Sequence, residues 1–205
     1  MAASCALTRR LPRVNTTATA GAALLGPGVA AYTAVLIGDT AVPAWHDGYP
    51  EMPFVFAGSA AMAAGGLGLL AAPPGESGPA RNLALVGQAM EMLAFERMTH
   101  RIGMIAEPYH SGRGGAYIRA GQVLGAIGAT GAALSGTPLV PAGAPRRVVA
   151  AVSGAALMAA SAATRFGVFH AGMASARDPK YTVVPQRERL AKHESAKVAH
   201  AVPPA

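Results

Sequence analysis

Cysteine, aromatic side chains and charge are all scarce in this chain of 205 residues. The one cysteine, Cys5, excludes an intrachain disulfide, a zinc site built from several cysteines and an iron–sulphur cluster held by this chain alone. Charged residues make up 13% of the sequence, whereas soluble domains have about 25%. This charge is too little to cover a water-exposed surface, so the composition argues against a soluble globular protein.

The hydrophobic residues, 52% of the sequence, lie in long runs without charge at 16–37, 52–72 and 148–163. Runs of this length suit the hydrocarbon core of a bilayer, which needs about 20 apolar residues per helix. The sequence therefore predicts an all-α fold, a polytopic transmembrane helix bundle of about five spans. The predicted spans are 17–40, 54–72, 82–105, 116–135 and 148–173, within a membrane domain 17–173.

Two basic segments flank the predicted membrane domain. Residues 1–16 resemble the start of a signal peptide, but the apolar stretch that follows is too long for one, which favours a retained helix. Residues 174–205 form a polar, basic C-terminal arm that we expect to be ordered to about Leu190. The net charge of +7 comes from the ends of spans and from this arm, without interleaved aromatic residues. We therefore expect membrane lipids, and no nucleic acid, among the partners.

Predicted span 82–105 differs from the others because it carries ionisable groups. Glu91 lies near its middle, and an ionisable group inside a membrane needs a partner, a proton or a wet cavity. Gln88 is one turn away and Arg165 lies on the last span, so Gln88, Glu91 and Arg165 form a predicted proton relay. Glu91 would be paired with Arg165 or protonated. The alternative is a neutral glutamate that serves packing or assembly.

A second polar group lies at the end of the same span. Glu96, Arg97, His100 and Arg101 follow one another within six residues. This spacing favours a charge cluster at the membrane interface over a buried relay.

Three stretches, 30–60, 106–115 and 164–190, carry a resemblance to a known family. The last of them, TRFGVFHAGMASARDPKYTVVPQRERL, is long, polar and irregular. On these stretches the chain resembles the C-terminal part of the polysulphide reductase membrane-subunit family, the NrfD-type proteins, over about 24–190. Members of that family have about eight membrane helices, and by this resemblance the chain begins near the fourth.

The resemblance implies a function in electron transfer. Family members are multi-pass subunits of the bacterial plasma (inner) membrane. They anchor an iron–sulphur electron-transfer subunit and a molybdopterin catalytic subunit, and exchange electrons with bound quinone, menaquinone or ubiquinone. They carry no haem or metal themselves and are not catalytic alone. The alternative is a truncated anchor or assembly subunit without its own quinone site; a small transporter ranks last.

The resemblance also assigns a quinone site. Tyr32 aligns with a tyrosine that contacts quinone in family members, and Asp39 and His46 follow it toward the interface. We therefore predict quinone binding by Tyr32, Asp39 and His46. A core tyrosine bonded to a backbone carbonyl, and solvated groups at a helix end, are the alternatives.

Haem ligation needs two histidines that face each other inside the bundle. All four histidines within the predicted membrane domain fall at span ends or in loops, which argues against haem. These residues are His46, His100, His110 and His170.

Overall fold

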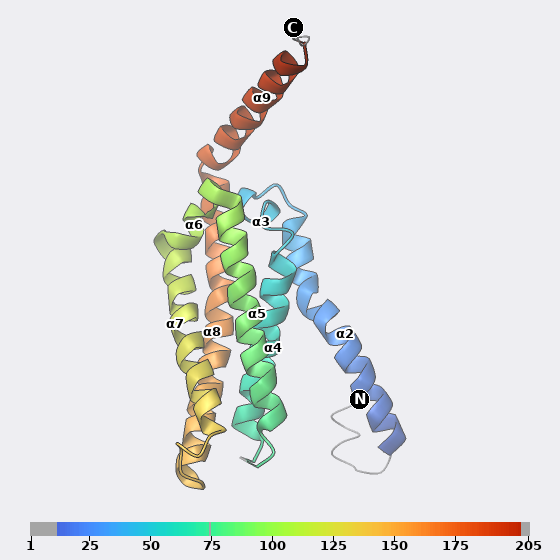
Figure 1. Ribbon diagram of the computed structural model, residues 1–205, viewed down its shortest axis with the longest axis vertical. Helices are drawn as coiled ribbons and strands as arrows, with labels where there is room; N and C mark the ends of the chain where they lie inside the picture. Colours follow the sequence, from blue (N-terminus) through green and yellow to red (C-terminus); the bar gives the residue numbers. More distant parts are fainter. Residues whose placement is uncertain (1–11, 74, 202–205) are drawn as a thin grey trace.

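A computed structural model describes residues 12–73 and 75–201, and these are almost entirely helical (Figure 1). In chain order the helices are α2 (Pro12–Gly38), α3 (Pro43–His46), α4 (Met52–Ala71), α5 (Gly78–Ile102), the 3₁₀ helix η1 (Gly103–Ala106), α6 (Glu107–His110), α7 (Gly112–Ser135), α8 (Ala144–Arg177) and α9 (Lys180–Ala201). No strand occurs in these two ranges, which confirms the all-α prediction.

Three of the helices are both long enough and apolar enough to cross a membrane. They are Thr16–Gly38, Met52–Ala71 and Ala144–Arg177. Helices α5 and α7, with 25 and 24 residues, also have the length, at about 1.5 Å per residue. Neither helix is apolar enough to count as a candidate span. In α5 the reason is its charged residues, Glu91 among them. Three of the five predicted spans are thus confirmed as candidate spans.

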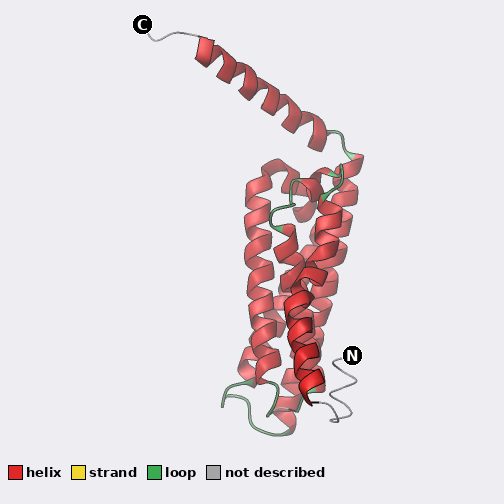
Figure 2. Ribbon diagram, turned by 90° about the vertical axis from the view of Figure 1, so that its right-hand side faces the viewer, coloured by secondary structure: helices red, strands yellow, loops and turns green. Residues whose placement is uncertain are grey.

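The long helices run alternately up and down (Figures 1 and 2). Helix α4 packs against α5 and α8, and α8 packs against α7, so these four form the bundle. The contact between α5 and α7, which closes the ring, is much smaller. Helix α2 packs mainly on α4 and diverges from the bundle along its length. The least closed side of the bundle therefore lies between α5 and α7.

Glycines allow the long helices to approach closely. A Cβ atom on Gly87 of α5 would lie 2.4 Å from the backbone nitrogen of Met62 and 2.7 Å from the carbonyl of Gly58, both on α4. Between α4 and α8, a Cβ on Gly154 would lie 2.3 Å from the carbonyl of Gly66. Backbone-to-backbone packing through small residues is typical of membrane helices, where apolar burial alone gives little driving force.

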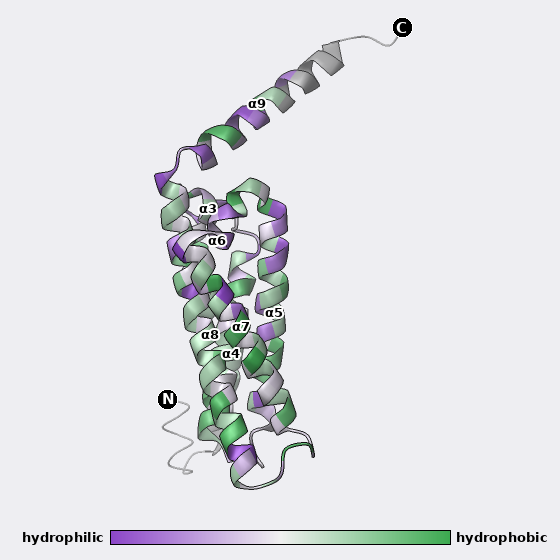
Figure 3. Ribbon diagram, turned by 90° about the vertical axis from the view of Figure 1, so that its left-hand side faces the viewer, coloured by the Kyte–Doolittle hydropathy of each residue, from purple (hydrophilic) through white to green (hydrophobic). Residues whose placement is uncertain are grey.

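Short helices and hydrophilic residues gather at one end of the bundle, where α3, α6 and the start of α9 lie (Figure 3). The hydroxyl of Tyr109 donates a hydrogen bond of 2.9 Å to the carbonyl of Ala44, and burial raises the pKa of Tyr109 above its usual 10.0. The indole nitrogen of Trp45 donates to the carbonyl of Val168 at 2.9 Å. These bonds attach the loop after α2 to α6 and α8.

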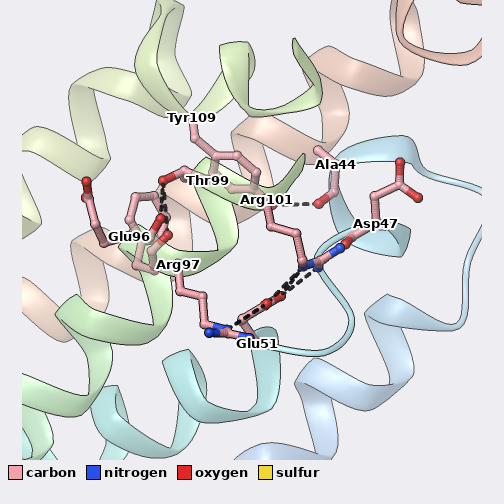
Figure 4. A network of polar contacts seen from close by, with 9 residues as sticks. Ala44, Asp47, Glu51, Glu96, Arg97, Thr99, Arg101 and Tyr109 are labelled. Atoms are coloured by element: carbon pink, nitrogen blue, oxygen red, sulfur yellow. Dashed lines mark hydrogen bonds and ion pairs between the residues drawn. The ribbon is translucent and has the colours of Figure 1, made fainter. Parts of the chain in front are cut away.

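An ion-pair network crosses the same end of the bundle (Figure 4). Arg101 donates to the carboxylate of Glu51 through Nη2 at 2.6 Å, and Arg97 lies 3.6 Å from that carboxylate. The hydrogen bond from Arg101 holds the pKa of Glu51 below its ordinary value of 4.5. The predicted interfacial cluster is therefore present, with His100 paired to Glu96 at 2.8 Å. Its central acid, Glu51, is a residue that the sequence did not single out.

The basic arm forms helix α9, which begins at Lys180 and continues to Ala201, beyond the predicted limit near Leu190. It leaves the polar end of the bundle and points away from it (Figures 1 and 2). An ion pair of 2.9 Å between Lys180 and Glu107 joins the start of α9 to α6. The hydrogen bond in this pair lowers the pKa of Glu107 and raises that of Lys180.

Candidate functional site

A cavity of about 260 Å³ lies where α5 and α7 contact each other least, with α8 behind it. Its walls are mostly apolar, as is usual for ligand pockets. Its polar lining residues are Gln88, Glu91, Gln122, Thr130 and Thr164. The side chains of Gln122 and Thr130 are exposed, so the cavity opens on the outer face of the bundle.

Glu91 is the one acidic side chain among the described residues that line this cavity. It is 8% exposed, and one carboxylate oxygen, Oε1, accepts a hydrogen bond of 2.7 Å from Thr164 of α8. The other oxygen, Oε2, is buried and has no hydrogen-bond partner among the described residues. Because buried polar atoms in folded proteins are nearly always paired, this oxygen marks a position beside the cavity where a hydrogen-bond donor is missing.

Gln88 provides a second unpaired acceptor in the same cavity. It lies one turn before Glu91 on α5, and its Oε1 atom is buried without a partner in the described part of the chain. Its side chain fits against Gly125 of α7, where a Cβ atom would lie 2.3 Å from Oε1. Two buried acceptors on one helix face therefore point to a ligand that brings its own donors.

Behind Glu91, a layer of hydroxyl groups leads to Arg165. The hydroxyls of Ser59 and Ser161 are 2.8 Å apart, and Nη1 of Arg165 donates to both, at 3.0 Å for Ser59. No ion pair within 4.0 Å joins Arg165 to Glu91, so the direct pairing predicted as one alternative is not formed. Gln88 and Glu91 line one cavity together with Thr164, whereas Arg165 lines a different cavity, next to α2.

The structure does not bring Tyr32, Asp39 and His46 around one cavity. Tyr32 is 61% exposed on α2, and Asp39 is exposed just after the end of that helix. His46 is exposed, and its Nδ1 lies 3.1 Å from the carbonyl of Gly38. His46 lines a different cleft, between α3 and α9. Quinone contact by these three residues stays a prediction from the resemblance.

Three polar residues of the α5–α7 cavity, Gln122, Thr130 and Thr164, were missed by sequence reasoning. Gln122 is the one amide side chain in the Ala/Gly-rich stretch 116–135, and that isolation is a signal that could have found it. Thr164 gave no such signal, because threonine is common in membrane helices. As to metals, no three His, Cys, Asp or Glu side chains of the described residues are grouped so that they could hold an ion.

In comparisons with family models, curated proteins and solved structures, nothing matches this chain. The resemblance to NrfD-type subunits therefore rests on the sequence stretches alone.

Proposed function

We propose that this chain is a polytopic membrane subunit that binds a quinol in the α5–α7 cavity. In this proposal it anchors an iron–sulphur subunit and a molybdopterin subunit in the bacterial plasma membrane, and the iron–sulphur subunit accepts the electrons. The observation that carries the quinol site is the pair of buried acceptors, Gln88 Oε1 and Glu91 Oε2, that lack donors in a mostly apolar cavity.

Five crossings are part of the proposal. In chain order the five helices are α2, α4, α5, α7 and α8, and each runs in the direction opposite to the one before it (Figure 1). Helices α5 and α7 lie in the chain between the candidate spans α4 and α8, and all five helices are long enough to cross a bilayer. The charges on α5 support its crossing, because Arg97 and Arg101 lie in its last two turns and Glu91 is buried. Ionisable residues in membrane helices face the bundle interior or the interfaces in this way.

The chemistry of quinol suits the polar atoms of this cavity. A quinol is an apolar ring with hydroxyl donors, and its oxidation releases two protons and two electrons. One hydroxyl would donate to Glu91 Oε2, and that carboxylate would take one proton as a general base, release it to solvent and then take the second, while both electrons pass to the iron–sulphur subunit. Thr164 holds the other carboxylate oxygen, which fixes the orientation of the base. Gln88 would accept a hydrogen bond from the ligand beside it.

A binding experiment with matched variants tests this proposal. The protein in lipid nanodiscs is titrated with a short-chain ubiquinol or menaquinol under anaerobic conditions, and with the corresponding quinone. We expect Glu91→Gln to weaken quinol binding about tenfold or more, since a hydrogen bond to a charged group contributes about 1.5–3 kcal/mol. Glu96→Gln is the control, because Glu96 is exposed on the same helix outside the cavity. Equal quinol affinity of both variants would contradict the proposal.

An anchor or assembly subunit without its own quinone site is the second candidate. One observation favours this candidate. In the Thr16–Gly38 helix, only 6% of the most apolar 18-residue stretch is buried. Leu24 and Leu25 of this helix are 82% and 70% exposed, so its outer face is available to lipid or to another membrane subunit. This candidate predicts no saturable quinol binding, but co-purification of partner subunits that is lost when α2 is removed.

A further inference from the structure

A second cavity, on the other side of the bundle from the quinol site, lies under α2. Its volume is about 480 Å³, within the usual range of about 300–1,000 Å³ for ligand pockets. Helices α2, α3, α4 and α8 enclose it. Its lining residues include Val29, Thr33, Trp45, Phe56 and Arg165.

Arg165 is the one charged side chain among the described residues that line this α2 cavity. Its guanidinium lies 5.6 Å from the centre of the Phe56 ring, and its described acceptors, on Ser59 and Ser161, are all reached by Nη1. Nε and Nη2 therefore have no acceptor in the described part of the chain. A cation in an apolar membrane site needs an anionic partner or water, and no carboxylate lies within 4.0 Å.

The α2 cavity is accessible from the bilayer. Val29 is 74% exposed and Phe169, at the opposite wall, is 51% exposed. Phe56 lies five residues after Glu51, which places the cavity on the order of 8 Å below the ion-pair network of Figure 4. Arg165 itself donates to Ser59, eight residues after Glu51, so its guanidinium lies on the order of 12 Å below that network, at the inner end of the cavity.

We propose that the α2 cavity binds a long-chain fatty acid, with its carboxylate on Arg165 and its chain along α2. A guanidinium edge and a carboxylate match in shape and charge, and can form two parallel hydrogen bonds. Except for Arg165, Thr33 and the paired indole nitrogen of Trp45, the described walls are apolar, which suits a single acyl chain. The ester groups of a phospholipid would find few donors there. This site does not depend on the proposed quinol site.

Trp45 makes this proposal directly measurable, because it is the single tryptophan of the chain and lines the α2 cavity. Bromine atoms on an acyl chain quench tryptophan fluorescence at contact. The intact protein in nanodiscs is titrated with 9,10-dibromostearate and, in parallel, with its methyl ester, which lacks the charge. We expect saturable quenching by the acid at a concentration about tenfold or more below that needed for the ester.

Variants then assign the binding to Arg165. Arg165→Gln should remove the difference between acid and ester, and Arg165→Lys should keep part of it, because the charge remains but the paired geometry is lost. Glu96→Gln, exposed on α5 outside both cavities, should retain the difference, and quinol titrations of the same variants show separately whether the quinol site fails. Equal quenching by acid and ester in the unsubstituted protein would overturn the proposal even if Arg165→Gln does not fold. An unchanged isotherm in folded Arg165→Gln would also overturn it.

Discussion

The close approach of α4 and α5 allows a quantitative test at Gly87. In Gly87→Ala the new methyl group would meet backbone atoms of α4 at 2.4, 2.7 and 2.9 Å, from Met62, Gly58 and Ala61. Carbon atoms in contact need about 3.5 Å or more, so the two helices must separate by about an ångström along this contact. Overpacking of this kind costs about 1–3 kcal/mol.

Gly21→Ala is the matched control, because Gly21 lies within α2 and a Cβ atom there meets nothing within 4 Å. Both substitutions gain the same helix propensity, about 1 kcal/mol, so that gain cancels between them. The difference between the two free energies of unfolding is then the steric cost alone, about 1–3 kcal/mol in favour of Gly21→Ala.

Unfolding of the two variants by SDS in mixed micelles, followed by the fluorescence of Trp45, measures this difference. The single tryptophan is attached to α8 through the carbonyl of Val168, so its signal reports separation of the bundle. Equal stability of the two variants would refute the reasoning, since it would mean that α4 and α5 do not touch at Gly87.

Two further predictions concern the polar end of the bundle. The lowered pKa of Glu51 means that its bond to Arg101 stabilises the protein above pH 4.5 and that this contribution is lost as the pH falls through the folded-state pKa. An acid titration of unfolding free energy should show this decline, and Glu51→Gln should remove it; the same slope in that variant would refute the assignment. Tyr109→Phe should cost about 1–3 kcal/mol, because the buried carbonyl of Ala44 loses its donor. SDS unfolding measures this, and an unchanged midpoint would contradict it.

The helical fold could be predicted because charge-free runs of bilayer length are visible in the sequence itself. The structure moves the start of all five predicted helices outward, and 148–173 extends at both ends to Ala144–Arg177, whereas the helices predicted at 17–40, 54–72 and 82–105 end slightly earlier. Polar residues at helix ends look like loop residues in a sequence, although tertiary contacts keep them helical. The length of helix α9 was underestimated for the same reason. Its sequence is polar throughout, so it does not show whether the helix ends at Leu190 or continues beyond it.

The candidate site could be predicted only in part. Glu91 and Gln88 were visible because a carboxylate and an amide within a membrane span are unusual. Which partner Glu91 takes depends on the rotation of α8 about its axis, and this turns Thr164 toward Glu91 and Arg165 toward the α2 cavity. Sequence spacing does not determine that rotation between separate helices. Glu51 was missed because it lies in a loop, where a glutamate ordinarily faces water.

The α5–α7 cavity opens on the side of the bundle, and this position determines how the affinity of the proposed quinol site should be expressed. Exposed Gln122 and Thr130 border the mouth of this cavity, so if α5 and α7 cross the membrane as proposed, the ligand would enter from the lipid phase. Occupancy would then follow the mole fraction of quinol among the lipids, and a dissociation constant in aqueous molarity would change with the amount of lipid in the sample. Titrations at two lipid-to-protein ratios should superimpose only when plotted on the mole-fraction scale.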